Sequence, residues 1–133
     1  MSETPPQRTA GFRFWPTDAL FIAACGAAAW FLWCPLGEMV WLLPVAVGHF
    51  FLFCNVFRVR RSYELIWTAI FIINMLAWFL TDSFSWGWVL GIQAPVTVAV
   101  IVLEMRSSRY HGIFCRSINA EHLDRWLAGE MFH

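Results

Sequence analysis

The residue best placed to carry chemistry is His49, which lies near the middle of an uncharged apolar run over residues 39–57. An ionisable side chain at that depth is a functional candidate, because an imidazole can ligate haem, relay protons or hydrogen-bond a quinone. Asn74 and Gln93 occur in two later apolar runs and are candidates to form a small polar cluster with His49. The simpler interpretation, which we favour, is a neutral histidine that hydrogen-bonds across helices and contributes ~1 kcal/mol to packing.

A haem with two histidine ligands would need a second histidine within an apolar run, and this chain has none. A haem would therefore need a second copy of the chain, a ligand other than histidine, or a partner subunit. We predict no cofactor, and a haem or quinone site built on His49 remains the alternative.

The other histidines, His111, His122 and His133, lie with Cys115 in the polar C-terminal segment. His111 and Cys115 are four residues apart, which on a helix would place two ligands on one face. The remaining spacings match no zinc-binding pattern, so no metal site is predicted. The four cysteines of the chain form no CxxC pair, and we interpret them as small apolar side chains.

A second group with recognisable chemistry is a set of arginines that could hold a phosphate or an anionic lipid headgroup. Its members are Arg58, Arg60 and Arg61, between two apolar runs, and Arg106 and Arg109, after the last run. A simpler role is sufficient to explain them, since arginines beside apolar runs set the orientation of a chain in a membrane.

No catalytic constellation is visible. The sequence contains no GxSxG, HExxH or nucleotide-binding loop, and no pair of acidic residues within an apolar run. All nine basic residues are arginine, so a lysine Schiff base and a P-loop lysine are excluded. A coupled transporter usually needs a carboxylate deep in a span, and its absence counts against that class. We therefore predict that the chain is not an enzyme.

Composition indicates a membrane protein, because hydrophobic residues make up 59 % of the 133 residues and charged residues 14 %. Charged residues separate four apolar runs, each about long enough to cross ~30 Å of hydrocarbon as a helix. The predicted fold class is an all-α bundle of four transmembrane helices, at about residues 16–34, 39–57, 65–81 and 86–103. Residues 1–15 form an N-terminal lead, residues 16–104 the transmembrane domain, and residues 105–133 a tail with an amphipathic helix near 119–128.

The placement of arginine predicts the orientation. The nine arginines lie in the N-terminal lead, in the connection between the second and third runs, and in the tail; the other two connections carry none. By the positive-inside rule both termini are cytoplasmic, in a multi-pass protein of a bacterial-type inner membrane. Most tryptophans are expected at the outer interface, and Trp15 and Trp67 at the inner one.

Small residues at four-residue steps predict faces where another helix can approach closely. The predicted packing residues are Ala23, Ala27, Gly48, Gly87, Gly91, Pro95 and Ala99. The last four include a GxxxG motif. Spacing alone leaves open whether these faces pack within one chain or between chains.

The function predicted from these observations is a non-enzymatic accessory protein that packs against another membrane protein. Many packing faces and almost no recognisable chemistry favour it. The alternative is a homo-oligomeric transporter or channel for an ion or small solute, using His49. A third candidate is an electron-transfer subunit that binds haem or quinone at the same residue. The formal net charge is zero, so no nucleic-acid partner is predicted.

Overall fold

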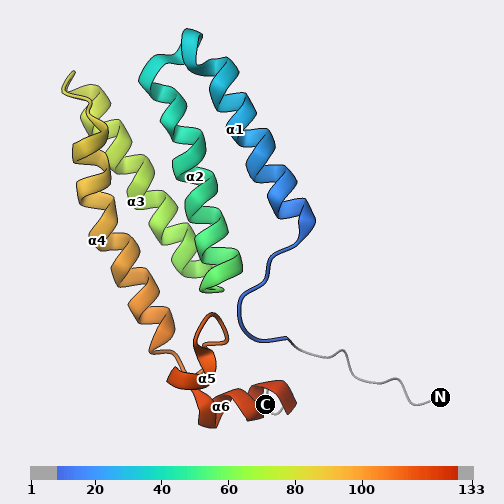
Figure 1. The fold of residues 1–133 in the computed structure, drawn as a ribbon. Helices are drawn as coiled ribbons and strands as arrows, with labels where there is room; N and C mark the ends of the chain where they lie inside the picture. The colour runs from blue at the N-terminus through green and yellow to red at the C-terminus, as the bar shows by residue number, and fades with distance from the viewer. Residues whose placement is uncertain (1–8, 129–133) are drawn as a thin grey trace.

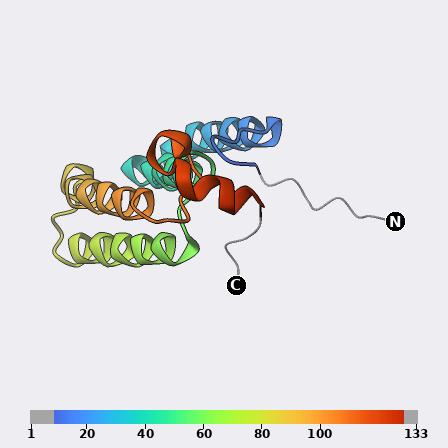
Figure 2. The same ribbon diagram turned by 90° about the horizontal axis from the view of Figure 1, so that it is seen from below.

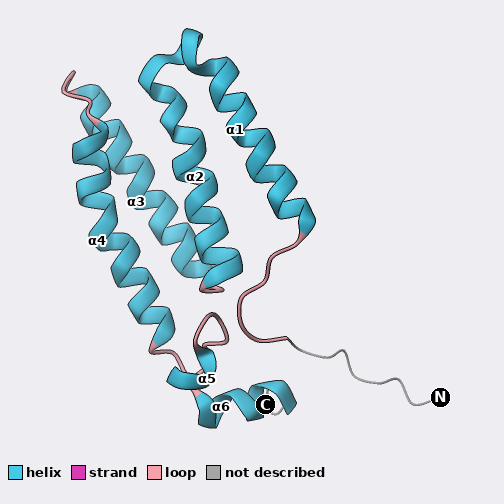
Figure 3. Ribbon diagram, viewed as in Figure 1, coloured by secondary structure: helices cyan, strands magenta, loops and turns pink. Residues whose placement is uncertain are grey.

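The computed structural model describes residues 9–128, and within this range the chain forms helices and loops without strands (Figure 1, Figure 3). In chain order the elements are α1 (Pro16–Leu36), the 3-10 helix η1 (Gly37–Trp41), α2 (Leu42–Phe51), the π-helix η2 (Leu52–Val56), α3 (Arg61–Leu80), α4 (Trp86–Met105), α5 (Cys115–Ile118) and α6 (Ala120–Ala128). The expectation of an all-helical chain is confirmed for the described residues.

Three helical segments of the described chain are long and apolar enough to cross a membrane: Pro16–Val56, Arg61–Leu80 and Trp86–Met105. The first has 41 residues. As one straight helix it would be about 60 Å long, twice the ~30 Å of a bilayer core. Instead the chain turns back at η1, so that α1 and α2 lie side by side (Figure 1). Gly37 begins this turn with φ 54°, a conformation open to glycine at little cost.

Helix α2 begins beside a proline and ends in a π-helical turn. Pro44 is its third residue, within the first turn, where a missing backbone N–H removes no helical hydrogen bond. At the other end, the N–H of Phe57 donates to the carbonyl of Leu52, 3.0 Å away and five residues back. This spacing is the signature of a π-helical turn.

The core lies where α3 and α4 pack against each other and against the end of α2. Its buried hydrophobic side chains are Phe53, Trp67, Phe71, Val89 and Val100. Helix α1, by contrast, has no buried residue and packs mainly on α2 and η1. Seen from below, α1 lies at the edge of the bundle, on the side away from α3 (Figure 2).

Both terminal segments gather at one end of the helices, which we call the arginine end (Figure 1). It consists of residues 9–15, 57–61 and 105–128, and every described arginine belongs to one of these segments. Here Leu123 of α6 is buried with Tyr110 and Cys115, against Phe57 and Met105. The apolar edge of α6 therefore covers the end of its own bundle.

The N-terminal segment and the tail both bond to the end of η2. The N–H of Arg13 donates to the carbonyl of Asn55 at 3.2 Å, and the N–H of Ile113 donates to the carbonyl of Val56 at 2.9 Å. Carbonyls at a helix C-terminus have no partner within the helix, so these bonds satisfy two of them.

The two terminal segments are also bonded to each other, through the N–H of Gly11 and the carbonyl of His111 at 2.9 Å. The tail approaches the bundle most closely at Gly112. A Cβ atom at this position would lie 2.5 Å from the carbonyl oxygen of Phe57, so only glycine allows the approach.

Candidate functional site

His49 projects from α2 into the space between the hairpin of α1 and α2 and the hairpin of α3 and α4. Both of its ring nitrogens are hydrogen-bonded. Nδ1 lies 2.9 Å from the carbonyl oxygen of Val45, one turn earlier. Nε2 lies 3.2 Å from Oγ1 of Thr97 on α4. The second bond joins α2 to α4 through two residues that are 48 positions apart in the chain.

Aromatic rings enclose the imidazole. The ring of His49 stacks on Trp67 of α3, with centroids 4.4 Å apart, and meets Phe53 edge-on at 6.0 Å. Trp67 in turn stacks on Phe71 at 5.3 Å and donates its indole N–H to Thr97 at 2.8 Å. Trp67 is 5 % exposed, and Thr97 supplies the hydrogen-bond partner that its buried indole N–H needs.

The hydroxyl of Thr97 can serve His49 in either protonation state. A carbonyl oxygen only accepts hydrogen bonds, so Nδ1 of His49 must be protonated and donate to the carbonyl of Val45. In the neutral ring Nε2 is then an acceptor, and Thr97 donates to it. In the charged ring Nε2–H donates to Thr97, which redirects its own proton to the carbonyl of Gln93, 3.0 Å away. Either arrangement leaves the ring fully hydrogen-bonded.

Gln93 joins the same cluster from one turn earlier on α4. Its Nε2 donates to the carbonyl of Trp67 at 3.2 Å, which links α4 to α3. Its Oε1 has no hydrogen-bond partner in the described chain, although the residue is 1 % exposed. A buried acceptor without a donor is uncommon, and this oxygen is where a water or a polar ligand could bind.

Asn74 lies apart from His49. Its Nδ2 donates to the carbonyl of Val89 at 3.0 Å, and its Oδ1 accepts the indole N–H of Trp78 at 3.1 Å. It is two turns along α3 from Trp67, about 10 Å. Of the three residues considered for a polar cluster, the structure therefore brings together His49 and Gln93, and it adds Thr97 and Trp67.

Thr97 could have been found from its spacing. The buried residues of α4 are Val89, Gln93, Thr97, Val100 and Glu104, which recur at three- and four-residue steps and so share one face. The polar residues on that face mark where α4 meets the rest of the chain. Spacing does not show which residue of α2 they meet.

A cofactor at His49 would have to compete with these contacts. Ligation of haem iron through Nε2 would require the ring to release Thr97, and the stacked Trp67 occupies one face of the ring. Elsewhere in residues 9–128, no group of three or more His, Cys, Asp or Glu side chains is arranged to hold a metal ion.

The predicted packing residues are all exposed in the single chain: Ala23, Ala27, Gly48, Gly87, Gly91, Pro95 and Ala99. A Cβ atom added at Gly48 or Gly91 would meet nothing within 4 Å. At 100° per residue, the stripe on α4 lies about 180° from the buried face of the same helix. The small-residue stripe therefore points away from the core.

A furrow runs between α1 and α2. Its larger part has a volume of about 590 Å³ and is lined by Trp30, Trp33 and Trp41, among others. A smaller part, about 240 Å³, lies toward the arginine end and is lined by residues that include Gly48 and Phe51. Both parts are almost wholly apolar.

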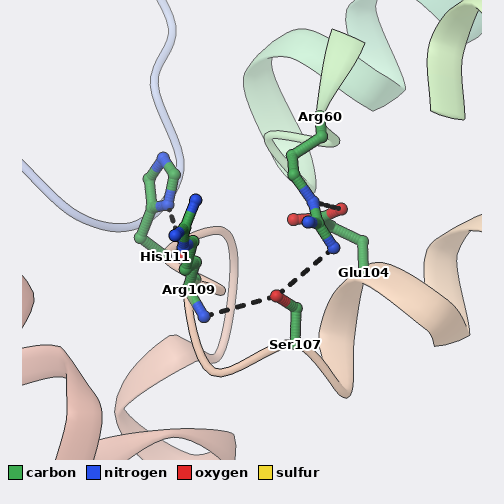
Figure 4. A network of polar contacts seen from close by, with 5 residues as sticks. All are labelled: Arg60, Glu104, Ser107, Arg109 and His111. Atoms are coloured by element: carbon green, nitrogen blue, oxygen red, sulfur yellow. Dashed lines mark hydrogen bonds and ion pairs between the residues drawn. The ribbon is translucent and has the colours of Figure 1, made fainter. Parts of the chain in front are cut away.

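At the arginine end, Arg60 and Glu104 join the start of α3 to the end of α4. Nε of Arg60 lies 3.1 Å from Oε2 of Glu104, the only ion pair in the described chain (Figure 4). The guanidinium also donates to Oγ of Ser107 at 3.4 Å. Glu104 is 1 % exposed, so its carboxylate depends on this arginine for its charge partner.

The remaining arginines considered for a headgroup differ in their surroundings. The guanidinium of Arg58 donates to the carbonyl of Thr9. Arg61, Arg106 and Arg109 form no ion pair with any described residue. Arg13, which sequence reasoning did not select, lies over the ring of Trp15 at 5.1 Å.

The tail histidine and cysteine are separated by the local fold. His111 lies in a loop, where its ring stacks on Trp126 at 4.4 Å and its Nδ1 bonds to the carbonyl of Arg109 at 2.9 Å (Figure 4). Cys115 is buried at the start of α5. His133 lies outside the described residues.

Searches against protein families, curated proteins and solved structures give no match. Function is therefore inferred from the geometry of this chain.

Proposed function

We propose that this chain is a multi-pass protein of a bacterial-type inner membrane that acts as a non-enzymatic accessory subunit, packing against another membrane protein. It crosses four times, with both termini in the cytoplasm. The hairpin of α1 and α2 supports this number of crossings, because its 41 residues are enough for two. The gathering of the described arginines at one end supports the orientation.

The observation that carries the accessory role is the position of Gly87, Gly91, Pro95 and Ala99. These residues are exposed on the side of α4 that points away from the core. Within a bilayer the hydrophobic effect does not drive helices together, so close backbone approach along small residues is a main source of association. A smooth stripe that the chain does not cover itself is suited to a helix of another protein.

The test is chemical crosslinking in native membranes, followed by purification and identification of stoichiometric partners. We expect a heterologous membrane protein to be recovered with the wild-type chain and lost with Gly91→Leu. That leucine meets no described atom within 4 Å at its Cβ, so the fold of the chain should be unaffected. Ala69→Leu, at an exposed position on α3, is the matched control and should retain the partner. Recovery of only monomers or homo-oligomers would contradict the proposal.

A second candidate is a homo-oligomeric transporter or channel that uses His49. The hydrogen-bonded group of His49, Thr97 and Gln93 favours it, because the threonine hydroxyl can follow a change in protonation of the ring. His49→Ala should then abolish flux in proteoliposomes while leaving assembly intact, and unchanged flux would contradict this version.

A third candidate is an electron-transfer subunit that binds haem or quinone at His49. An absorbance spectrum of the purified protein without a Soret band would contradict the haem version.

A further inference from the structure

The furrow between α1 and α2 is shaped for a chain thinner than a helix. Along α2 it extends from Trp41 to Phe51, about 15 Å. A helix about 10 Å across would need about 1,200 Å³ over this length, which is more than the two parts of the furrow hold together, at about 590 Å³ and about 240 Å³. Its sides are open at Gly26 and Gly48, where an added Cβ would meet nothing within 4 Å. An extended hydrocarbon chain is thinner than a helix and matches the apolar lining of the furrow.

The furrow leads to the arginine end. Gly48, Phe51 and Asn55 recur at three- and four-residue steps on α2 and η2, and so share one face. Phe51 contacts the rings of Phe12 and Phe14, with centroids 6.2 Å and 5.8 Å away.

The backbone N–H of Arg13, between those two phenylalanines, donates to the carbonyl of Asn55. The N-terminal segment thus places Arg13 beside the end of the furrow.

Two arginines without a carboxylate partner, Arg13 and Arg58, lie at this end of the furrow. Arg13 and Arg58 form no ion pair with any described residue. The N–H of Arg13 donates to the carbonyl of Asn55, three residues before Arg58. The guanidinium of Arg58 donates to the carbonyl of Thr9, four residues before Arg13. These two bonds bring the two arginines to the same corner of the arginine end. In agreement, burial lowers the pKa of Arg58, and the charge of Arg13 lowers it further. Arg58 donates one N–H to Thr9, and a guanidinium has five. An anion between the two arginines would offset their repulsion.

We propose that this chain binds one anionic phospholipid, with an acyl chain in the furrow between α1 and α2 and its phosphate at Arg13 and Arg58. Charge complementarity selects the occupant: the apolar furrow takes the hydrocarbon, and the unpaired guanidinium groups at its end take the phosphate. Guanidinium groups suit this role, because they can donate two parallel hydrogen bonds to one phosphate. The lipid would cover a surface of α1 and α2 that the core leaves bare.

The test is native mass spectrometry of the purified full chain with phosphatidylglycerol or phosphatidylcholine of identical acyl chains. We expect the wild type to bind one phosphatidylglycerol in preference to phosphatidylcholine, on the order of tenfold or more. The double variant Arg13→Gln/Arg58→Gln should lose this preference. The double variant Arg106→Gln/Arg109→Gln removes the same charge from the same end and should keep it. An equal loss in both double variants would show a general charge effect and overturn the proposal.

The furrow is tested separately by filling it. Gly26→Leu and Gly48→Leu should each reduce binding of both lipids, whereas Gly91→Leu, on α4, should not. A photoreactive acyl chain provides a test on the unaltered protein, and we expect its crosslinks in the segments 22–34 and 44–51. Crosslinks confined to α3 and α4, or full lipid binding by both filled variants, would overturn the proposal. So would loss of a co-purifying protein from the filled variants while lipid binding stays unchanged.

Discussion

Nε2 of His49 lies 3.2 Å from Oγ1 of Thr97, and this bond joins the hairpin of α1 and α2 to the hairpin of α3 and α4. The same threonine oxygen accepts the indole N–H of Trp67. One hydroxyl therefore holds side chains from three helices. This arrangement agrees with the interpretation of His49 as a residue that hydrogen-bonds across helices, and it leads to the first prediction.

Thr97→Val should destabilise the fold by about 1–3 kcal/mol, because it leaves buried donor and acceptor groups on Trp67 and His49 without a partner. The free energy of unfolding can be measured by denaturant titration in mixed micelles. Thr68→Val makes the same change at an exposed position of α3, and its cost should be smaller. Equal costs at the two sites would show that the contact with His49 contributes nothing.

Asn74→Leu should also destabilise the fold, and its cost should add to that of Thr97→Val within about 0.5 kcal/mol. The two clusters share no hydrogen-bond partner, since Asn74 bonds to Val89 and Trp78. The double variant tests this directly. A larger coupling energy would mean that Asn74 belongs to the His49 cluster after all.

The ion pair of Arg60 and Glu104 should respond asymmetrically to substitution. Arg60→Gln leaves a carboxylate that is 1 % exposed without its charge partner, whereas Glu104→Gln leaves an arginine that can reach solvent. We expect Arg60→Gln to cost about 1–3 kcal/mol, reduced from the value for a fully buried pair because Arg60 is exposed.

Glu104→Gln should cost less than Arg60→Gln, because it removes the buried carboxylate itself. Denaturant unfolding curves of the two variants measure the difference, and an equal loss of stability in both would contradict the prediction.

Gly112→Ala should release the tail from the bundle, since its Cβ would lie 2.5 Å from the backbone oxygen of Phe57 and 2.8 Å from the hydroxyl oxygen of Tyr110. Limited proteolysis should then cleave within residues 105–128 faster than in the wild type. Gly91→Ala is the matched control, because nothing lies within 4 Å of its added Cβ. Unchanged cleavage in Gly112→Ala would show that the tail is not held there.

The phenol of Tyr110 should ionise at a higher pH than that of a free tyrosine. Burial, followed by the effects of Cys115 and Glu104, raises its pKa to about 12, against about 10 for an unfolded chain. The folded state therefore favours the neutral phenol, and this contribution to stability is present below about pH 10 and is lost as pH rises toward about 12. The chain has two tyrosines, so ultraviolet titration of Tyr63→Phe reports on Tyr110 alone. A midpoint near that of free tyrosine would contradict this prediction.

Much of the fold could be predicted because a membrane span is specified by local composition. The apolar runs appear as helices, and the tail helix expected near 119–128 is found as α6, Ala120–Ala128. Helix bounds follow less directly. Helix α3 begins at Arg61, before the apolar run that starts at residue 65, because a helix can extend into polar residues at its end.

The sequence by itself determined that this is a helical protein with membrane-length apolar segments, since backbone groups in lipid must be satisfied within each segment. It also determined the distribution of arginine. Only the tertiary structure decided that His49 meets Thr97, that Asn74 lies elsewhere, and that Arg60 pairs with Glu104. The physical reason is that spacing along a helix sets the depth of a residue, whereas its partners depend on how each helix is rotated and packed against the others. That rotation is set by contacts among residues far apart in the chain.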